Sequence, residues 1–218
     1  WAYNPVANTW TQRAPIGGPP AARSQHTMVW AGTKGIVYGG YSGAGNLNDV
    51  WWYSPGSGWS LQVTTGGPEF GRRAHSAVWT GSEMIVWGGD PYNGGASLDS
   101  GARYDPASGT WLPVRIEAPQ PIRRANHTSV WTGAEVLTWG GYRWDGYQGS
   151  TLNTGDRYDP ALDQFTSMSV TTSTPSARAR HTAVWTGAEM VVWGGTGNSS
   201  LLSSGGAYDP AANAWRGT

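Results

Sequence analysis

Short apolar runs alternate with polar turns along nearly the whole chain, and the alternation repeats. The stretch 75–111 shows the unit: HSAVW and MIVW flank the turn TGSE, and ARYD and the segment ending at Trp111 flank PASG. Runs of β-branched and aromatic residues separated by such turns are typical of antiparallel hairpins. Each unit therefore predicts four short strands, termed A to D in chain order. No stretch shows a convincing helical period.

The spacing of the units predicts the fold class. The first half of the unit begins at four histidines, which lie 49, 52 and 54 residues apart: His26, His75, His127 and His181. A repeat of about 50 residues indicates a propeller or solenoid. A four-stranded sheet cannot bury both apolar faces alone, whereas radial stacking against neighbouring sheets buries both. We therefore expect an all-β propeller with blades of four antiparallel strands.

Three positions in each unit resemble the kelch repeat: a glycine doublet after strand B, a tyrosine in strand C and an aromatic residue in strand D. They are Gly39-Gly40, Tyr53 and Trp59; Gly88-Gly89, Tyr104 and Trp111; Gly140-Gly141, Tyr158 and Phe165; and Gly194-Gly195, Tyr208 and Trp215. Phe165 replaces the usual tryptophan, and the segment from Tyr53 to Trp59 is one residue short. The resemblance covers essentially the whole chain and implies a kelch-type β-propeller, similar to kelch motif proteins and the central domain of galactose oxidase.

About four and a half blades are visible in a single domain, 1–218. A half blade at 1–10 contains only strands C and D, and full blades follow at about 26–59, 75–111, 127–165 and 181–215. The chain ends with a complete C–D pair, so these residues do not visibly close a ring by joining N-terminal and C-terminal strands. Three explanations stay open: a fragment of a longer propeller, a ring completed by another copy or chain, or an unusual or engineered design.

The loops between strands B and C carry the variation. Between the glycine doublet and the tyrosine lie 12, 14, 16 and 12 residues in successive units, while the other spacings are nearly constant. Variable loops on a fixed scaffold usually carry function. In an antiparallel blade the B–C and D–A loops emerge on one face. The binding residues expected there are Tyr41, Tyr92, Asn93, Tyr142, Arg143, Trp144, Asp145, Tyr147, Arg73, Arg124 and Arg180.

The four histidines begin the strands expected to be innermost, so we expect them to ring the channel mouth. Imidazole groups ligate metals, and nearby arginines bind anions. A residue that recurs in every blade more simply satisfies the same backbone groups in each, and blade geometry disfavours tight tetrahedral coordination. We favour the structural interpretation and expect no metal and no cofactor.

Aromatic residues fall into two groups. We expect the strand tryptophans to pack between blades; they are Trp30, Trp79, Trp87, Trp131, Trp139, Trp185 and Trp193. The aromatics of the loop RWDGYQG do not repeat, which suits glycan stacking or protein contact, with packing inside the loop as the alternative. The aspartates of the YDP turns are expected to accept hydrogen bonds from turn amides.

Composition narrows the function classes. Only 13% of residues are charged and the formal net charge is zero, so nothing favours binding to nucleic acid or membrane. Without cysteine, the chain lacks the cross-linked cysteine that copper-radical oxidases of this kind need. One lysine against thirteen arginines, with Asn/Ser/Thr/Gly-rich loops, mildly favours an extracellular or cell-envelope location.

We therefore expect a non-catalytic propeller that binds a protein or glycan partner on the loop face. The alternatives are a kelch-type enzyme, such as a sugar mutarotase-like or epimerase-like propeller, and a structural module completed by other chains. An enzyme would need convergent acid–base groups with perturbed pKa values.

Overall fold

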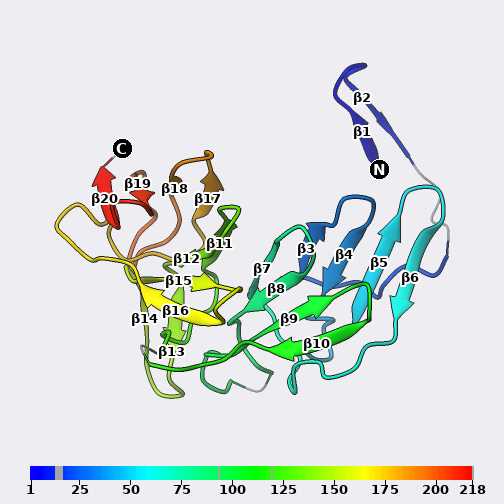
Figure 1. Ribbon diagram of the computed structural model, residues 1–218, viewed down its shortest axis with the longest axis horizontal. Helices are drawn as coiled ribbons and strands as arrows, with labels where there is room; N and C mark the ends of the chain where they lie inside the picture. The colour runs from blue at the N-terminus through cyan, green and yellow to red at the C-terminus, as the bar shows by residue number, and fades with distance from the viewer. Residues whose placement is uncertain (13–16, 93, 119, 218) are drawn as a thin grey trace.

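The computed structural model describes residues 1–12, 17–92, 94–118 and 120–217, which form twenty strands and no helix. Four antiparallel sheets of four strands follow one another along an arc (Figure 1). Blade 1 consists of β3 (Thr27–Trp30), β4 (Gly35–Tyr38), β5 (Val50–Ser54) and β6 (Gly58–Gln62), and blade 2 of β7 (Ser76–Trp79), β8 (Met84–Trp87), β9 (Gly101–Asp105) and β10 (Thr110–Pro113). Blade 3 consists of β11 (Thr128–Trp131), β12 (Val136–Trp139), β15 (Gly155–Asp159) and β16 (Gln164–Ser167). Blade 4 consists of β17 (Thr182–Trp185), β18 (Met190–Trp193), β19 (Gly205–Asp209) and β20 (Ala214–Gly217). The predicted fold class is confirmed.

Two further hairpins lie outside the four blades. The first pairs β1 (Ala2–Asn4) with β2 (Thr9–Thr11), as predicted for a C–D pair, and stands apart from blade 1 in Figure 1. The second pairs β13 (Tyr142–Trp144) with β14 (Gly149–Thr151) inside the longest B–C loop. This second hairpin was not predicted.

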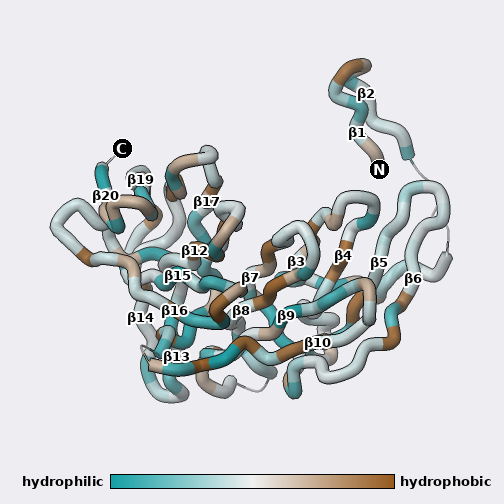
Figure 2. The backbone as a smooth tube through the Cα atoms, in the orientation of Figure 1, coloured by the Kyte–Doolittle hydropathy of each residue, from teal (hydrophilic) through white to brown (hydrophobic). Residues whose placement is uncertain are grey.

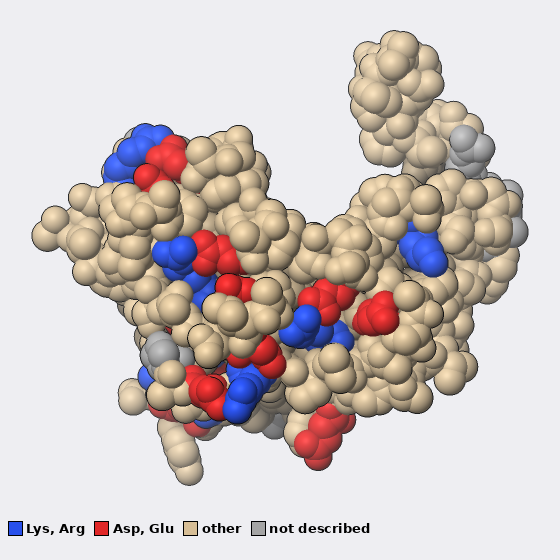
Figure 3. Space-filling model, viewed as in Figure 1, with Lys and Arg blue, Asp and Glu red and all other residues tan. Residues whose placement is uncertain are grey.

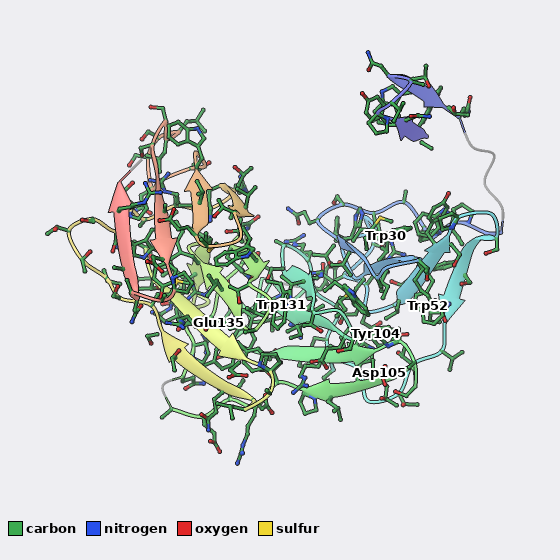
Figure 4. The ribbon with its side chains drawn as sticks, turned by 45° about the horizontal axis from the view of Figure 1, so that its top comes forward. Trp30, Trp52, Tyr104, Asp105, Trp131 and Glu135 are labelled. Atoms are coloured by element: carbon green, nitrogen blue, oxygen red, sulfur yellow. The ribbon has the colours of Figure 1, made fainter. Side chains whose placement is uncertain are left out.

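Local chemistry sets the turns within each blade. Asp105 lies at the turn between β9 and β10 (Figure 4), where its Oδ1 accepts a hydrogen bond of 2.8 Å from the backbone N–H of Ala107. Asp159 and Asp209 accept the equivalent bonds in blades 3 and 4. The expected role of the YDP aspartates is confirmed.

The first strand of each blade lies innermost. Contacts between blades link β3 to β7, β7 to β11 and β11 to β17. Along these strands and their β4, β8, β12 and β18 partners the chain is hydrophobic in many places (Figure 2), because neighbouring blades pack on both faces of blades 2 and 3 and on one face of blades 1 and 4.

Each blade has a leading face, which packs on the blade before it, and a trailing face, which packs on the blade after it. In β7, Ala77 and Trp79 pack into the core between blades 1 and 2, whereas Val78 belongs to the core between blades 2 and 3. In β11, Trp131 lies where blade 3 meets blade 2 (Figure 4). Strand alternation thus divides each sheet between two hydrophobic cores.

An aromatic triad closes each joint between blades. The last residue of the second strand packs on the tyrosine–aromatic pair of the next blade, with ring centroids 4.8 to 5.2 Å apart. The triads are Tyr38 with Trp111 and Tyr104, Trp87 with Phe165 and Tyr158, and Trp139 with Trp215 and Tyr208. The three positions of the repeat motif therefore meet across two blades.

The expectation that all strand tryptophans pack between blades holds only inside the arc. Trp87 and Trp139 are buried, but Trp30 and Trp193 are 53% and 51% exposed. Trp30 lies on the leading face of blade 1 and Trp193 on the trailing face of blade 4, and neither face is covered by another of the four blades.

The glycine doublet allows neighbouring backbones to touch. Gly88 has φ +65°, and a Cβ there would lie 2.4 Å from the carbonyl oxygen of Arg124 in the next blade. Gly89, with φ +99°, donates its N–H to that same oxygen at 2.8 Å. Because any side chain at Gly88 would collide with backbone, the first glycine is required by the joint.

Arg124 lies inside the fold, which corrects its assignment to the binding surface. Its side chain is fully buried, and its guanidinium donates to the carbonyl oxygens of Gly140 and Thr154 and to the carboxylate of Asp156 at 2.8 to 2.9 Å. These bonds tie the two ends of the B–C loop of blade 3 together, so Arg124 shapes the loop from below.

Replacing Arg124 by methionine tests this role. The change leaves Asp156 and two carbonyl groups without their donor in a buried site, which is expected to lower the free energy of unfolding by about 3–5 kcal/mol. Arg123→Met is the matched control, because the neighbouring Arg123–Asp99 ion pair is partly exposed, at 37% and 33%, and is expected to contribute less than about 1 kcal/mol. Urea denaturation measures both, and equal losses would contradict the assignment.

Candidate functional site

A chain of backbone hydrogen bonds runs along the inner edge of the four blades on the loop face, at the position expected for the channel mouth. It joins the residue that precedes each histidine, and these residues adopt left-handed backbone conformations with φ of 54° to 57°. They are Gln25, Ala74, Asn126 and Arg180. The N–H groups of the last three each donate to the carbonyl oxygen of the counterpart in the preceding blade, at 2.8 to 3.0 Å. The backbone is therefore fixed by the joints between blades.

The side chains on this fixed backbone differ in every blade. A second set of varied residues follows the glycine doublets, each in an antiparallel bridge with the approach to the first strand of its own blade: Tyr41, Asp90, Tyr142 and Thr196. Variation at positions whose backbone is constant is the arrangement expected of a recognition surface. We call these eight residues the channel-mouth set.

A cavity of about 480 Å³ opens beside the channel-mouth set, between blades 2, 3 and 4. Its polar lining includes Asp90, Asn126, Tyr142, Arg180 and Asn198. The hairpin of β13 and β14 forms one wall, and Thr151 in β14 donates its hydroxyl and its backbone N–H to Asn198 at 2.8 and 3.1 Å. This contact ties the hairpin to blade 4, so the cavity wall is held from both sides.

Two charged side chains, those of Arg180 and Asp90, line this cavity. Arg180 is exposed and forms no ion pair with the described residues, so its guanidinium is available to a ligand. Burial raises the pKa of Asp90, against the opposing effects of the Ser97 hydroxyl, which donates to its carboxylate at 2.9 Å, and of Arg73. The cavity can therefore present one strong cation, one partly buried carboxylate and several amide groups.

The predicted binding residues of the longest B–C loop differ in whether their side chains are held by hydrogen bonds or are exposed. Trp144 is held between loops, because its indole Nε1 donates to the Gly94 carbonyl and its backbone N–H donates to the Ser97 hydroxyl, both at 3.1 Å. Asp145 caps its own turn by accepting from the N–H groups of Tyr147 and Gln148 at 2.9 Å, and the bonds lower its pKa. Tyr147 is 94% exposed. Of these three, only Tyr147 projects freely.

Blades 1 and 2 contribute an aromatic group farther along the face. Tyr41 and Tyr92 stack with ring centroids 6.5 Å apart, and the Arg73 guanidinium lies 5.2 Å from the Tyr41 ring. Arg143 is exposed on β13. Asn93, also predicted as a binding residue, lies outside the described residues.

Three of the four histidines belong to the joints between blades, in agreement with the structural role favoured above. The Nε2 atoms of His75, His127 and His181 are hydrogen-bonded to the hydroxyls of Thr27, Ser76 and Thr128 in the preceding blades, at 2.7 to 2.8 Å. All three rings are buried, whereas His26 is exposed. Among the described residues no group of three His, Cys, Asp or Glu side chains could hold a metal ion.

Of the ten residues that line the cavity, only Tyr142 and Arg180 were predicted from the sequence. The missed residues with polar side chains are Asn126, Asp90, Thr151, Thr196 and Asn198. A signal for the first of them exists. The position before each histidine changes from Gln to Ala to Asn to Arg while the histidine itself is constant, and a varied position next to a constant one marks a surface side chain on a fixed backbone.

Charge is sparse on the face seen in Figure 3, where acidic and basic side chains are intermixed in a largely uncharged surface. No helix in the described part of the chain is long and apolar enough to cross a membrane.

Comparison with known families gives one result that covers the whole chain. The family model of the KLHDC2/KLHL20/DRC7 Kelch-repeats domain matches residues 1–141 and, in a second and overlapping match, residues 56–218. Among curated proteins no significant match is found.

The buried histidines predict a pH dependence of stability. Burial lowers the pKa of His75 to about 3 and of His181 to about 4, and it lowers that of His127 well below its ordinary value. In the unfolded chain these groups titrate near pH 6.5. Below that pH the histidines of the unfolded chain bind protons, whereas those of the folded chain stay neutral. The free energy of unfolding is therefore expected to fall as the pH is lowered from 6.5 to 4. The loss approaches about 1.4 kcal/mol per pH unit for each histidine.

Urea denaturation at pH 7 and pH 5 measures this loss. His127→Gln removes one titrating group and is expected to make the pH dependence shallower, whereas His26→Gln at the exposed counterpart is expected to change it little. If both variants kept the full pH dependence, other groups would be responsible for it.

Proposed function

The chain belongs to the kelch-repeat family, whose domains generally mediate protein interactions, and we propose that it binds a segment of a protein partner in the cavity between blades 2, 3 and 4. The observation that carries the proposal is the constant backbone of the channel-mouth set, on which each blade displays a different pair of side chains. A backbone that is already fixed before binding lowers the conformational entropy cost of binding.

The lining indicates the chemistry of the bound segment. Arg180 offers a planar pair of donors suited to a carboxylate, and Asn126 and Asn198 offer amide groups that pair with a peptide backbone. A cavity of about 480 Å³ is of ordinary size for a site that takes a few side chains. An extended peptide segment with an acidic residue opposite Arg180 would use both the guanidinium donors and the amide groups of this lining.

A glycan is the second candidate ligand. The stacked rings of Tyr41 and Tyr92, and the exposed ring of Tyr147, offer flat apolar surfaces beside polar groups, which is the chemistry of sugar stacking. This arrangement lies on the rim, whereas Arg180 lines the cavity. The two candidates therefore depend on different residues.

The enzyme alternative has less support. Asp90 is the cavity carboxylate whose pKa burial raises, and the three buried histidines are engaged between blades and do not line the cavity. A sugar mutarotase-like activity stays a hypothesis without an assigned acid–base pair. The extracellular or cell-envelope location likewise stays a prediction.

Selection from a random peptide library on the immobilised chain, followed by fluorescence polarisation, tests the proposal. Arg180→Ala is expected to weaken the selected peptides by about ten- to a hundredfold, because a charge-assisted hydrogen bond is worth about 1.5–3 kcal/mol. Arg143→Ala is the matched control: this arginine is exposed on the same face but does not line the cavity. Thermal melts establish that both variants fold.

Two outcomes would contradict the proposal. In the first, Arg180→Ala and Arg143→Ala weaken binding equally, which would indicate non-specific attraction to positive charge. In the second, no peptide is enriched while glycan arrays give binding that is lost on changing Tyr147 to Ala, which would favour the glycan.

A further inference from the structure

The hairpin of β13 and β14 (Figure 1) has two outer edges, and its register assigns the backbone groups of each. Hydrogen-bonded and non-hydrogen-bonded residue pairs alternate along an antiparallel hairpin. Backbone hydrogen bonds of 3.2 and 2.9 Å close its turn and its base, from Asp145 to Gln148 and from Leu152 to Gly141. The alternation makes two pairs non-hydrogen-bonded: Trp144 with Gly149, and Tyr142 with Thr151. These four residues therefore direct their backbone N–H and C=O groups toward the outer edges.

The outer edge of β13 is fully bonded. The N–H and C=O groups of Tyr142 exchange two hydrogen bonds with Ala125, at 2.7 and 2.9 Å. The C=O of Trp144 accepts from the backbone N–H of Ser97 at 2.9 Å, and its N–H donates to the Ser97 hydroxyl at 3.1 Å. All four outward groups of this edge are thus engaged by neighbouring loops.

The outer edge of β14 is bonded at one group. The N–H of Thr151 donates to the side-chain oxygen of Asn198 at 3.1 Å. The other outward groups are the N–H and C=O of Gly149 and the C=O of Thr151, and none of them forms a hydrogen bond with the described residues. Gly149 and Ser150 are exposed. An open strand edge is a template for pairing with another segment.

This open edge lines the cavity between blades 2, 3 and 4. Gly149 and Thr151 belong to the lining, together with Asn198 of blade 4. At Thr151 the Asn198 oxygen accepts the N–H that a backbone carbonyl of a third strand would otherwise accept. The ladder is thus begun by a side chain and left open at Gly149, inside a cavity of about 480 Å³.

We propose that the partner segment adds to the outer edge of β14 as a third strand of the hairpin. This inference rests on the proposed function and gives the bound segment its conformation. The segment exchanges two backbone hydrogen bonds with Gly149, and a residue two positions along donates its N–H to the C=O of Thr151. In recognition of this kind the main chain supplies affinity, and pockets for alternate side chains supply specificity.

The alternation of the added strand decides which of its side chains are recognised. Side chains of paired residues lie on the same face of a sheet, and residues two apart share that face. The face that carries Tyr142 and Thr151 lines the cavity, which Arg180 also lines. The acidic residue of the segment therefore occupies one of the alternate positions that pair with Gly149 or Thr151. The positions between them face away from the cavity.

Two features of Gly149 favour a peptide strand over a glycan at this edge. One residue presents a donor and an acceptor side by side, which is the pair that a single residue of an antiparallel strand satisfies. Glycine also removes the side chain that would separate two backbones, and the Tyr142 hydroxyl fills the space of the missing Cβ. A sugar can use single groups of this edge but imposes no two-residue period.

A methylation scan of a bound peptide tests this period. Short linear peptides with one fixed glutamate are selected on the wild-type chain, and the tightest is resynthesised with an N-methyl group at each backbone position in turn. Methylation at alternate positions is expected to weaken binding at least about tenfold, because it removes a bonded donor and places a methyl group against β14. At the positions between them the N–H groups point away from β14, so the expected change is less than about threefold. Fluorescence polarisation measures both.

Variants of the chain and amide exchange supply independent tests. Gly149→Pro removes the N–H, whereas Gly149→Ala keeps it, and both place a Cβ against the Tyr142 hydroxyl. The proline variant is expected to bind the peptide at least about tenfold more weakly than the alanine variant, and thermal melts establish that both fold. In the wild-type chain, NMR is expected to show the Gly149 N–H exchanging at least about tenfold more slowly in the complex.

Three results would overturn strand addition while leaving the proposed function standing. They are a peptide that requires Arg180 but shows no two-residue period in the methylation scan, equal binding by the proline and alanine variants, and an unchanged exchange rate of the Gly149 N–H in the complex. A failure of the proposed function is distinct, because binding would then be absent, or equally weakened by Arg180→Ala and Arg143→Ala. That outcome would overturn both.

Discussion

The joint between neighbouring blades is the interaction on which the rest of this fold depends. A four-stranded blade has two apolar faces and cannot bury either by itself, so the free energy of folding is gained between sheets. At each joint the glycine doublet removes the side chain that would keep two backbones apart, as Gly88 does beside Arg124. The aromatic triad then fills the space outside that contact. Bonding and packing therefore act on the same few positions, which explains why those positions repeat.

The joint also separates the scaffold from the recognition surface. Its innermost element is the chain of backbone bonds through the residues that precede the histidines, and this chain uses no side-chain atoms. Asn126 and Arg180 can therefore be exchanged for other residues without losing the bonds that fix their position. Conversely, Arg124 and His127 are committed to the scaffold, since their buried side chains bond to backbone and to the preceding blade. Neighbouring residues thus serve stability and recognition separately.

Most of the fold could be predicted from the sequence because its pattern is periodic, whereas the site lies where the pattern is broken. The arginines three residues before each histidine recur in all four blades, and those of blades 2 to 4 are buried, as Arg124 shows; Arg180, one residue before its histidine, has no counterpart and is exposed. Treating both as surface residues missed that distinction. Trp144 could not be assigned, because its partner Gly94 lies in a loop of another blade. Such contacts depend on the relative position of two variable loops, which no spacing encodes.

Phe165 distinguishes the joint between blades 2 and 3 from the other two joints, which have a tryptophan at this position. The three joints share one geometry, so a partly folded chain could dock a blade against the wrong neighbour and gain nearly correct contacts, a hazard of repeat proteins. The joint between blades 2 and 3 differs from the others: it pairs Trp87 with Phe165, and it uses Ser76 in place of a threonine, linked to Ser129 at 2.7 Å. Its smaller ring and smaller hydroxyl residue make this joint a poor match for the other two. A blade docked out of order at this joint would leave a gap or a steric clash, so the irregularity in the repeat favours the native order of blades over its alternatives.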